Sequence, residues 1–496
     1  MSQPSESHDT GTELRFLLKH SSIYGLGTVL SRVVAFLLLP LYTRHLTPRD
    51  YGLLELVDVT TGIIGTLAGL GVSFALGRLY FDATTLEERG RLVSTAYCLA
   101  VLSSALLILF VLPVAPLLAA WILSSPEDAS CFRIAFVGLL AGVLVDVGQV
   151  YLRLLYRSTL VISISLTSLV VGVTLNVVFI AYWKLGILGV LYSSLITRLL
   201  VGVPLAGWIL ARNGLRISLP TAVSLLRYSL PLLPSMIGTV ITNYSDRYFI
   251  RHFVSIADAG LYGLAMKIGT SVHYLITSPF IMVFLPRRFE VARGVDGRRV
   301  LADVFHSFLS VSLLASLVVA VFVDEILILM TTPPFYPSAA FVPAILASMV
   351  LLGLRYHFDL GIWYERRTDL VMWINISVSV VQVALAYFLI PPLGIWGAVA
   401  ASLGSLTLNA IAVYIVGSRL YPIPYDFRRA LKLVGLILLA YVASRALPFL
   451  PLPLAICWKA SIICLCAYTA FRARLLPTVG TRGYGFLAER SPVGAS

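Results

Sequence analysis

The chain has 496 residues, of which 58% are hydrophobic and only 12% are charged, and its mean hydropathy is +0.91. This composition offers too few charged side chains to cover a soluble globular surface, so it excludes that class of protein. The formal net charge of +13 could suit a nucleic-acid-binding protein. However, the basic residues lie in the loops between apolar segments rather than on one soluble face, so we expect no nucleic-acid partner.

Apolar segments of about twenty residues follow one another along the chain, each long enough to cross a bilayer core of about 30 Å as a helix. We therefore predict an all-α integral membrane protein with about fourteen transmembrane helices. In chain order the predicted spans are residues 21–42, 53–77, 92–113, 132–152, 159–182, 187–210, 229–250, 259–285, 303–330, 340–363, 370–390, 394–417, 431–447 and 453–471.

The polar N-terminal segment and the basic loops predict the topology. The apolar run after residue 20 has no small-residue cleavage site behind it, which indicates that no signal peptide is removed. If the N-terminus is cytoplasmic, nearly all loop arginines and lysines fall inside, and little beyond Arg44, Arg49, Lys184 and Arg251 falls outside. By the positive-inside rule we expect both termini in the cytoplasm.

Short motifs recur about 208 residues apart, which indicates a duplicated chain. Tyr51-Gly52-Leu53 returns as Ala259-Gly260-Leu261, and the LGIxG segment that begins at Leu185 returns at Leu393. Tyr156 likewise corresponds to Tyr364. Each repeat holds six predicted spans, an even number, so we expect two parallel six-helix bundles related by a pseudo-twofold axis along the membrane normal.

The repeat divides the chain into predicted parts. They are a cytoplasmic tail (1–20), an N-terminal bundle (21–211), a cytoplasmic linker (212–228), a C-terminal bundle (229–418), two extra helices (419–472) and a second cytoplasmic tail (473–496).

Ten charged residues fall within the predicted spans. They are Arg32, Glu55, Asp58, Asp146, Arg198, Asp246, Arg247, Lys267, Arg355 and Asp359. Each would cost about 2.5 to 3.5 kcal/mol at the centre of a bilayer. Ten such charges facing lipid would exceed the about 5 to 15 kcal/mol by which folded proteins are stable, so most must face one another or water.

The spacing of these residues supports two interpretations. Asp146, Gln149 and Arg153 share one helix face, and Arg355 and Asp359 lie four residues apart on another helix. In one interpretation the cations bind an anionic substrate in a hydrated cavity between the halves, with Arg198 and Arg355 assigned to it by the burial argument alone. The carboxylates of Asp58, Asp146, Asp246 and Asp359 are then candidates for coupling H⁺ or Na⁺. In the second interpretation, opposite charges within the spans form pairs whose only role is to hold the helices together.

Catalytic and metal-binding signatures are lacking in the sequence. It contains no phosphate loop, HExxH or GxSxG motif and no loop long enough for an enzyme domain, so we expect a transporter rather than an enzyme. Five cysteines, mostly within apolar segments, indicate neither a disulfide framework nor a metal cluster. We therefore expect no cofactor and no metal site.

Three segments resemble the bacterial polysaccharide flippases, the O-antigen and exopolysaccharide transporters of the multidrug/oligosaccharidyl-lipid/polysaccharide (MOP) exporter superfamily. The first runs from Tyr24-Gly25 through Ser31-Arg32 and Pro40-Leu41-Tyr42-Thr43-Arg44 to Asp50-Tyr51-Gly52. The second comprises Asn243, Asp246-Arg247, Gly260-Leu261-Tyr262 and Lys267-Ile268, and the third is the paired LGIxG segments. The resemblance covers roughly residues 15–420.

This resemblance implies a flippase that moves an undecaprenyl-pyrophosphate-linked oligosaccharide across the bacterial inner membrane by alternating access, coupled to H⁺ or Na⁺. It implies that Arg32, Asn243, Asp246, Arg247 and Lys267 line or support the cavity. Besides the lipid-linked oligosaccharide, we expect a polysaccharide polymerase and a chain-length regulator as partners. A drug/cation antiporter, a peptidoglycan lipid II flippase, and a membrane-embedded glycan polymerase or ligase remain open as alternatives.

Overall fold

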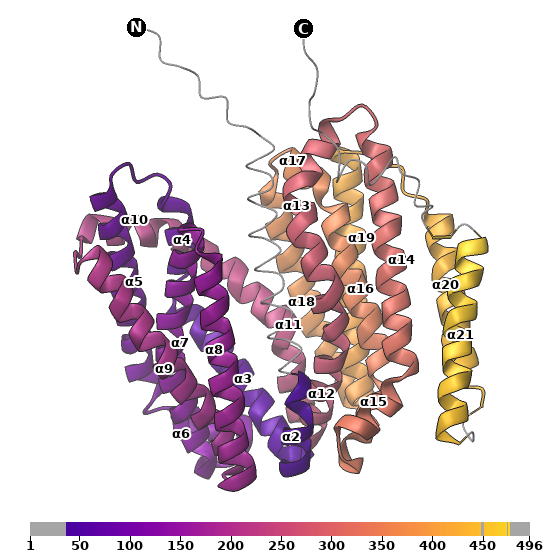
Figure 1. Cartoon of the computed structure of the whole chain (residues 1–496), viewed down its shortest axis with the longest axis horizontal. Helices are drawn as coiled ribbons and strands as arrows, with labels where there is room; N and C mark the ends of the chain where they lie inside the picture. Colours follow the sequence, from indigo (N-terminus) through magenta and orange to yellow (C-terminus); the bar gives the residue numbers. More distant parts are fainter. Residues whose placement is uncertain (1–35, 448–450, 474, 477–496) are drawn as a thin grey trace, which may run out of the picture.

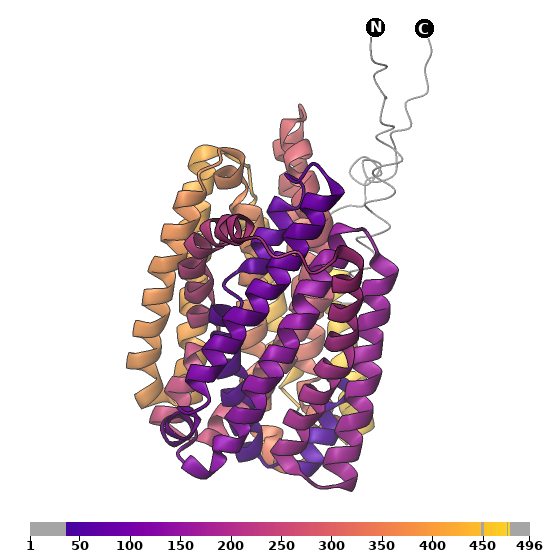
Figure 2. The same cartoon turned by 90° about the vertical axis from the view of Figure 1, so that its left-hand side faces the viewer.

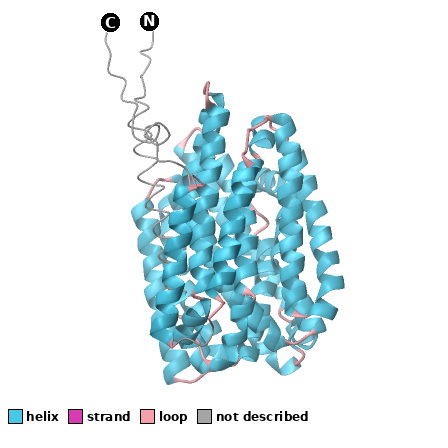
Figure 3. Ribbon diagram, turned by 90° about the vertical axis from the view of Figure 1, so that its right-hand side faces the viewer, coloured by secondary structure: helices cyan, strands magenta, loops and turns pink. Residues whose placement is uncertain are grey.

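The computed structural model describes residues 36–447, 451–473 and 475–476. Within these ranges every regular element is a helix, as Figure 3 shows. The first half contains α2 (Leu39–His45), α3 (Pro48–Ala68), α4 (Val72–Leu79), α5 (Leu86–Val111), α6 (Ala115–Leu118), α7 (Ala129–Leu154), α8 (Ser158–Asn176), α9 (Gly186–Asn213) and α10 (Leu219–Ser229). The rest contains α11 (Leu233–Phe253), α12 (Ile256–Val272), α13 (Ser278–Arg293), α14 (Gly297–Val321), α15 (Val323–Met330), α16 (Val342–Phe358), α17 (Leu360–Tyr364), α18 (Thr368–Leu393), α19 (Ile395–Leu420), α20 (Phe427–Ser444) and α21 (Leu452–Arg472).

The described helices fit a multi-pass membrane protein. Eleven helical segments are long and apolar enough to cross a bilayer, and a twelfth is reached if Leu219–Leu232 and Met236–Phe253, bent by 47° at their junction, form one span. The predicted count of fourteen is therefore not confirmed. Most of the predicted span 21–42 lies outside the described residues, and α20 carries Arg428, Arg429 and Lys432 within its first two turns.

The two halves form two helical bundles that stand side by side (Figure 1). Figure 2, which views the molecule from the side of the first half, shows that the long helices of this bundle run roughly parallel to one another. The hairpin of α20 and α21 packs on α14 at the edge of the second bundle. The predicted all-α fold of two like-oriented bundles with an appended C-terminal pair is confirmed.

The duplication extends to the residues that begin equivalent helices. The Thr47 hydroxyl accepts a hydrogen bond from the backbone N–H of Asp50 at the start of α3, and the Ser255 hydroxyl does the same for Asp258 at the start of α12. Both pairs cap a helix N-terminus, where backbone N–H groups have no partner within the helix. Because Thr47 and Ser255 are 208 positions apart, as are Asp50 and Asp258, the repeat preserves the helix start itself.

Two turns show where the repeat is regular and where it shifts. Gly186 and Gly394 both have a φ of 58°, a left-handed conformation that glycine adopts without strain, which explains why the LGIxG motif recurs. Tyr156 and Arg366 have φ values of 55° and 57°, each two residues before the helix that follows. The structural counterpart of Tyr156 is therefore Arg366 and not the predicted Tyr364, because the second repeat gains two residues before this turn and loses two again before Gly394.

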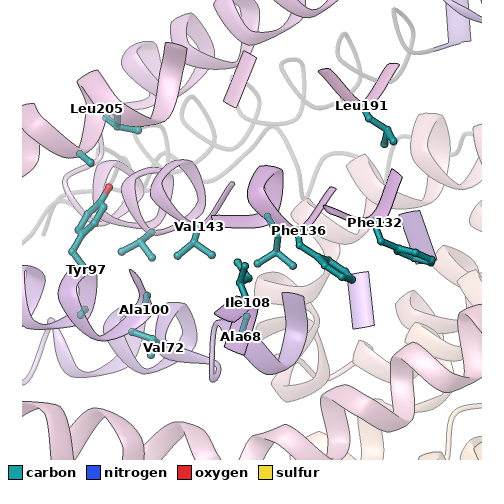
Figure 4. Close-up of a cluster of buried hydrophobic side chains, with 14 of the residues drawn as sticks. Ala68, Val72, Tyr97, Ala100, Ile108, Phe132, Phe136, Val143, Leu191 and Leu205 are labelled. Carbon is teal, nitrogen blue, oxygen red and sulfur yellow. The ribbon is translucent and has the colours of Figure 1, made fainter. Parts of the chain in front are cut away.

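A large apolar core holds the first bundle together (Figure 4). Phe132 and Phe136 of α7 are completely buried in it, and their rings stack with centroids 5.7 Å apart. Burial of such rings stabilises a bundle through dispersion as well as area, since close packing is the main attraction between helices within lipid. This core gives the first bundle a rigid frame for the polar side chains that face away from it.

The bundles meet closely where α3 crosses α12. A Cβ atom on Gly52 would overlap the carbonyl of Ile256, and one on Gly260 would overlap the carbonyl of Pro48. Two equivalent glycines of the repeat thus lie opposite each other where the two helices cross. Because neither glycine has a side chain, the two backbones come into contact near the first residues of α3 and α12.

Candidate functional site: a polar cavity

A cavity of about 1400 Å³ lies against the first bundle. Helices α3, α7, α8 and α9 form most of its wall, and α2 and α11 contribute Tyr42 and Tyr244 from the opposite side. Its charged lining residues are two carboxylates and two guanidinium groups: Asp58, Asp146, Arg153 and Arg198. The cavity therefore faces the second half of the chain but takes its charges from the first.

One face of α7 carries a polar stripe into the cavity. Asp146, Gln149 and Arg153 all line it, so the shared face that their spacing predicts is confirmed. The side chains of Asp146 and of Asp58 on α3 are exposed to the cavity, and neither forms an ion pair or hydrogen bond with another described residue. Both carboxylates are thus open to water or to a bound molecule.

Arg198 reaches into the cavity from α9 and lies across α7. Its Nη1 donates a hydrogen bond to the carbonyl of Gly138 at 3.1 Å. A Cβ atom on Gly142, one turn further along α7, would lie 3.1 Å from the same nitrogen, so the glycine leaves room for the guanidinium group. One donor is engaged in this way, and the exposed remainder of the group can bind a ligand.

Uncharged polar groups form the opposite part of the wall. Asn176 accepts a hydrogen bond from the Tyr42 hydroxyl at 3.1 Å and donates one to Ser193 at 2.8 Å. Thr197 also lines the cavity, and its buried hydroxyl has no hydrogen-bond partner within the described part of the chain. Sequence reasoning from charge missed these residues. The signal was the spacing of Ser165, Ser168, Gly172 and Asn176 by three or four positions on α8.

Lys267 lies between the two halves, beside the cavity rather than in its lining. Its Nζ donates a hydrogen bond to the Tyr51 hydroxyl at 3.1 Å and stands 5.6 Å from the centre of the Tyr42 ring and 5.5 Å from that of Tyr51. Such rings stabilise a cation through their π faces. Lys267 forms no ion pair with any described carboxylate, and the Tyr42 ring that it contacts is part of the cavity lining.

Arg247 is committed to a buried network between α11 and α3. Its Nη1 lies 2.8 Å from Asp246 Oδ1 and donates to the backbone carbonyl of Asn243 at 2.7 Å, and its Nε lies 4.0 Å from Glu55 Oε2. The Tyr262 hydroxyl donates to the second oxygen of Asp246. None of these groups is part of the cavity lining. The network joins the two halves, which fits the pairing interpretation for Asp246 and Arg247.

Arg355 and Asp359 lie in the second bundle, away from the cavity lining, and do not pair with each other. Helix α16 ends at Phe358, so Asp359 turns instead toward α13, where Arg288 Nη1 lies 2.5 Å from its Oδ1. Trp363 Nε1 donates to the other carboxylate oxygen at 3.0 Å, and Arg355 donates to Asn375. Sequence reasoning missed Arg288 because 71 positions separate it from Asp359.

Arg32 and a metal site are the remaining features that the sequence analysis addressed. Arg32 lies outside the described residues, so the structure does not locate it. Within the described ranges, no group of three or more His, Cys, Asp and Glu side chains could hold a metal ion.

Comparisons with known proteins bear on the family. Residues 41–332 match the model of the family described as polysaccharide biosynthesis protein. None of the curated protein sequences compared with the chain matches it. Among solved structures, the lipid II flippase MurJ in its inward closed conformation superposes with a TM-score of 0.74 at 12% identity, over 91% of this chain and 99% of MurJ.

Two other solved structures share the fold. An inward-facing multidrug resistance MATE transporter of the MOP superfamily has a TM-score of 0.65 at 17% identity, covering 78% of this chain and 94% of the transporter. A MOP superfamily transporter from Pyrococcus furiosus has a TM-score of 0.58 at 16% identity, covering 81% and 95%. The chain therefore belongs to the polysaccharide biosynthesis protein family, and it has the same fold as the lipid II flippase and the MOP superfamily transporters.

Proposed function

We propose that this transporter flips an undecaprenyl-pyrophosphate-linked oligosaccharide across the bacterial inner membrane by alternating access. The observation that best supports this proposal is a cavity of about 1400 Å³ with carboxylate, guanidinium, amide and hydroxyl groups in its wall. This volume exceeds the about 300 to 1,000 Å³ usual for small-molecule sites. A glycan of several sugars needs such room and such a mixture of donors and acceptors, whereas an apolar drug needs neither.

The pyrophosphate requires cations, and Lys267 and Arg198 are the candidates that the described residues supply. Lys267 forms no ion pair with a described carboxylate and is held by two tyrosines, so its charge is free to act toward an incoming phosphate once Tyr42 moves. Arg198 presents unused donors to the cavity. Arginine binds phosphate through paired hydrogen bonds and lysine as a point charge. Arg32 stays a third candidate through the resemblance of its motif.

Asp58 and Asp146 support a coupling of transport to H⁺ or Na⁺. Both carboxylates face the cavity without an ion-pair partner in the described part of the chain, so each can take up a proton or a cation there. Asp246 and Asp359 are already paired with arginines. Both termini then face the cytoplasm. A polysaccharide polymerase and a chain-length regulator would use the flipped oligosaccharide on the opposite side of the membrane.

Depletion of the protein in its native cell tests this proposal. We expect a lipid-linked oligosaccharide to accumulate on the cytoplasmic leaflet, measured by mass spectrometry of extracted lipids and by protection of the glycan from an external modifying reagent. Accumulation of lipid II instead would identify the peptidoglycan flippase. If no lipid-linked intermediate accumulates while sensitivity to cationic drugs rises, the chain is a drug antiporter and the proposal is wrong.

A further inference from the structure

The first bundle offers a binding surface with balanced charge. The four charged side chains of the cavity lining comprise two carboxylates and two guanidinium groups, and Arg198 lies within electrostatic range of both Asp58 and Asp146. Arg153 acts on Asp146 in the same way. The positive charge of each arginine is thus offset within the wall itself. A surface of this kind gives no net attraction to an acidic ligand among its described residues.

The hydrogen-bonding groups of this wall suit sugar hydroxyls. An ionised carboxylate only accepts hydrogen bonds, and its two oxygens can accept from two neighbouring hydroxyls of one sugar ring. Asp146 and Gln149 stand one turn apart on α7, and the free hydroxyl of Thr197, a residue only 9% exposed, lies on the facing helix α9. The wall therefore combines open acceptors with a buried hydroxyl that has no partner within the described residues, an arrangement that a polyhydroxylated ligand completes.

We infer that the part of the wall formed by Asp58, Asp146, Gln149 and Thr197 binds the glycan itself and selects repeat units without acidic sugars. This inference rests on the proposed function. A uronic acid placed in the cavity would bring its carboxylate near Asp58 or Asp146, and like charges placed side by side in a binding site oppose binding. A neutral hexose places a hydroxymethyl group there instead and meets no repulsion. The pyrophosphate, which all such substrates share, contributes nothing to this selection.

The test uses the full chain reconstituted in phosphatidylcholine vesicles. Two probes are compared: an undecaprenyl-pyrophosphate-linked trisaccharide of neutral hexoses, and the same molecule with one hexose replaced by its uronic acid. A fluorophore on the terminal sugar reports the leaflet through an impermeant quencher. We expect the neutral probe to be flipped at least about tenfold faster than the acidic probe, which is the size of a single unfavourable charge contact.

Variants then assign the selection to the carboxylates. We expect Asp58→Asn and Asp146→Asn each to reduce the preference for the neutral probe, and the double variant to bring the two rates within about twofold, since the repulsion is gone. Gel filtration in detergent shows whether each variant is folded, and the ratio of the two flipping rates, rather than either rate alone, measures the preference. The matched control is Glu365→Gln, an exposed acidic residue outside the cavity lining, which should keep the wild-type preference.

The outcomes separate this inference from the proposed function. Equal or faster flipping of the acidic probe by the wild-type chain would overturn the inference and leave the flippase function standing. A preference that survives in the double variant would also overturn the assignment to Asp58 and Asp146. Failure of the wild-type chain to flip either probe would overturn the proposed function itself.

Discussion

Arg198 occupies the cavity through a single hydrogen bond to the Gly138 carbonyl, made possible by the space above Gly142. We expect Arg198→Gln to lower export at least tenfold, because the cavity loses a cation with unused donors. The variant should remain folded, since the loss of one charged hydrogen bond costs only about 1.5 to 3 kcal/mol. Export is measured as surface polysaccharide and folding by gel filtration in detergent.

The matched control for Arg198 is Arg91→Gln, an exposed arginine on α5 that pairs with Glu87. It removes the same charge from a surface position, so export should not change. Normal export by Arg198→Gln would remove Arg198 from the substrate cavity.

Asp359 and Arg288 form a buried ion pair that joins two helices of the second bundle. We expect Asp359→Asn to lower stability by about 3 to 5 kcal/mol, because Arg288 is left buried without its counter-charge. The double variant Asp359→Leu with Arg288→Met should regain much of that loss, since no charge then remains buried. Thermal unfolding in detergent measures both, and equal loss in the single and double variants would contradict a direct pairing.

Sequence reasoning identified charges that lie within helices, but it did not predict which of them pair and which face the cavity. The shared face of Asp146, Gln149 and Arg153 was predicted correctly because helical spacing determines it. The partners of Asp359 and Arg247 depend on which helices pack together, and nothing local in the sequence encodes Arg288 or Glu55 as neighbours. Uncharged groups such as Thr197 were missed because the argument from the cost of placing a charge in the bilayer does not apply to them.

Among the elements, the crossing of α3 and α12 depends on Gly52 and Gly260. We expect Gly52→Ala and Gly260→Ala each to lower stability by about 1 to 3 kcal/mol, because the added methyl group overlaps a backbone carbonyl of the other helix. The loss is measured as a lower Tm in detergent, and crosslinking of the two halves should fall with it.

Gly207→Ala on α9 is the control for this crossing, since a Cβ atom there meets nothing within 4 Å. It should leave the Tm unchanged or raise it, because alanine favours a helix over glycine. If all three substitutions affect the Tm alike, helix propensity explains the result and the close crossing does not.

Element boundaries followed the sequence where caps and glycines mark them. The starts of α3 and α12 coincide with Thr47 and Ser255, and the LGIxG turns precede α9 and α19. The repeat failed locally at Tyr156, where the backbone shows two extra residues that a constant offset could not detect. The sequence also did not predict which bundle α2 packs in. Although α2 comes first in the chain, its Leu39 and Tyr42 are part of the apolar core of the second half.

For the whole molecule, composition and duplication were sufficient to predict a membrane transporter of two bundles. An even number of spans per repeat requires like orientation, and the structure has that arrangement. What they could not predict is the asymmetry of the cavity. The charged lining residues come from the first half, whereas Asp246 and Asp359 of the second half pair with arginines outside the lining. The two halves of the repeat thus differ in the charges that they present to the cavity.

The accessibility of α8 to water tests the central claim of a hydrated cavity within the first bundle. Ser168 lines the cavity, and Val170, two positions further along the same helix, is exposed on the outside of the bundle. In a chain whose five cysteines are replaced, Ser168→Cys should react with a membrane-impermeant charged thiol reagent and be protected by the lipid-linked glycan. Val170→Cys should stay unlabelled because lipid surrounds it. If the cysteine at position 168 is unreactive, or both positions react equally, there is no such cavity and the proposed transport path is wrong.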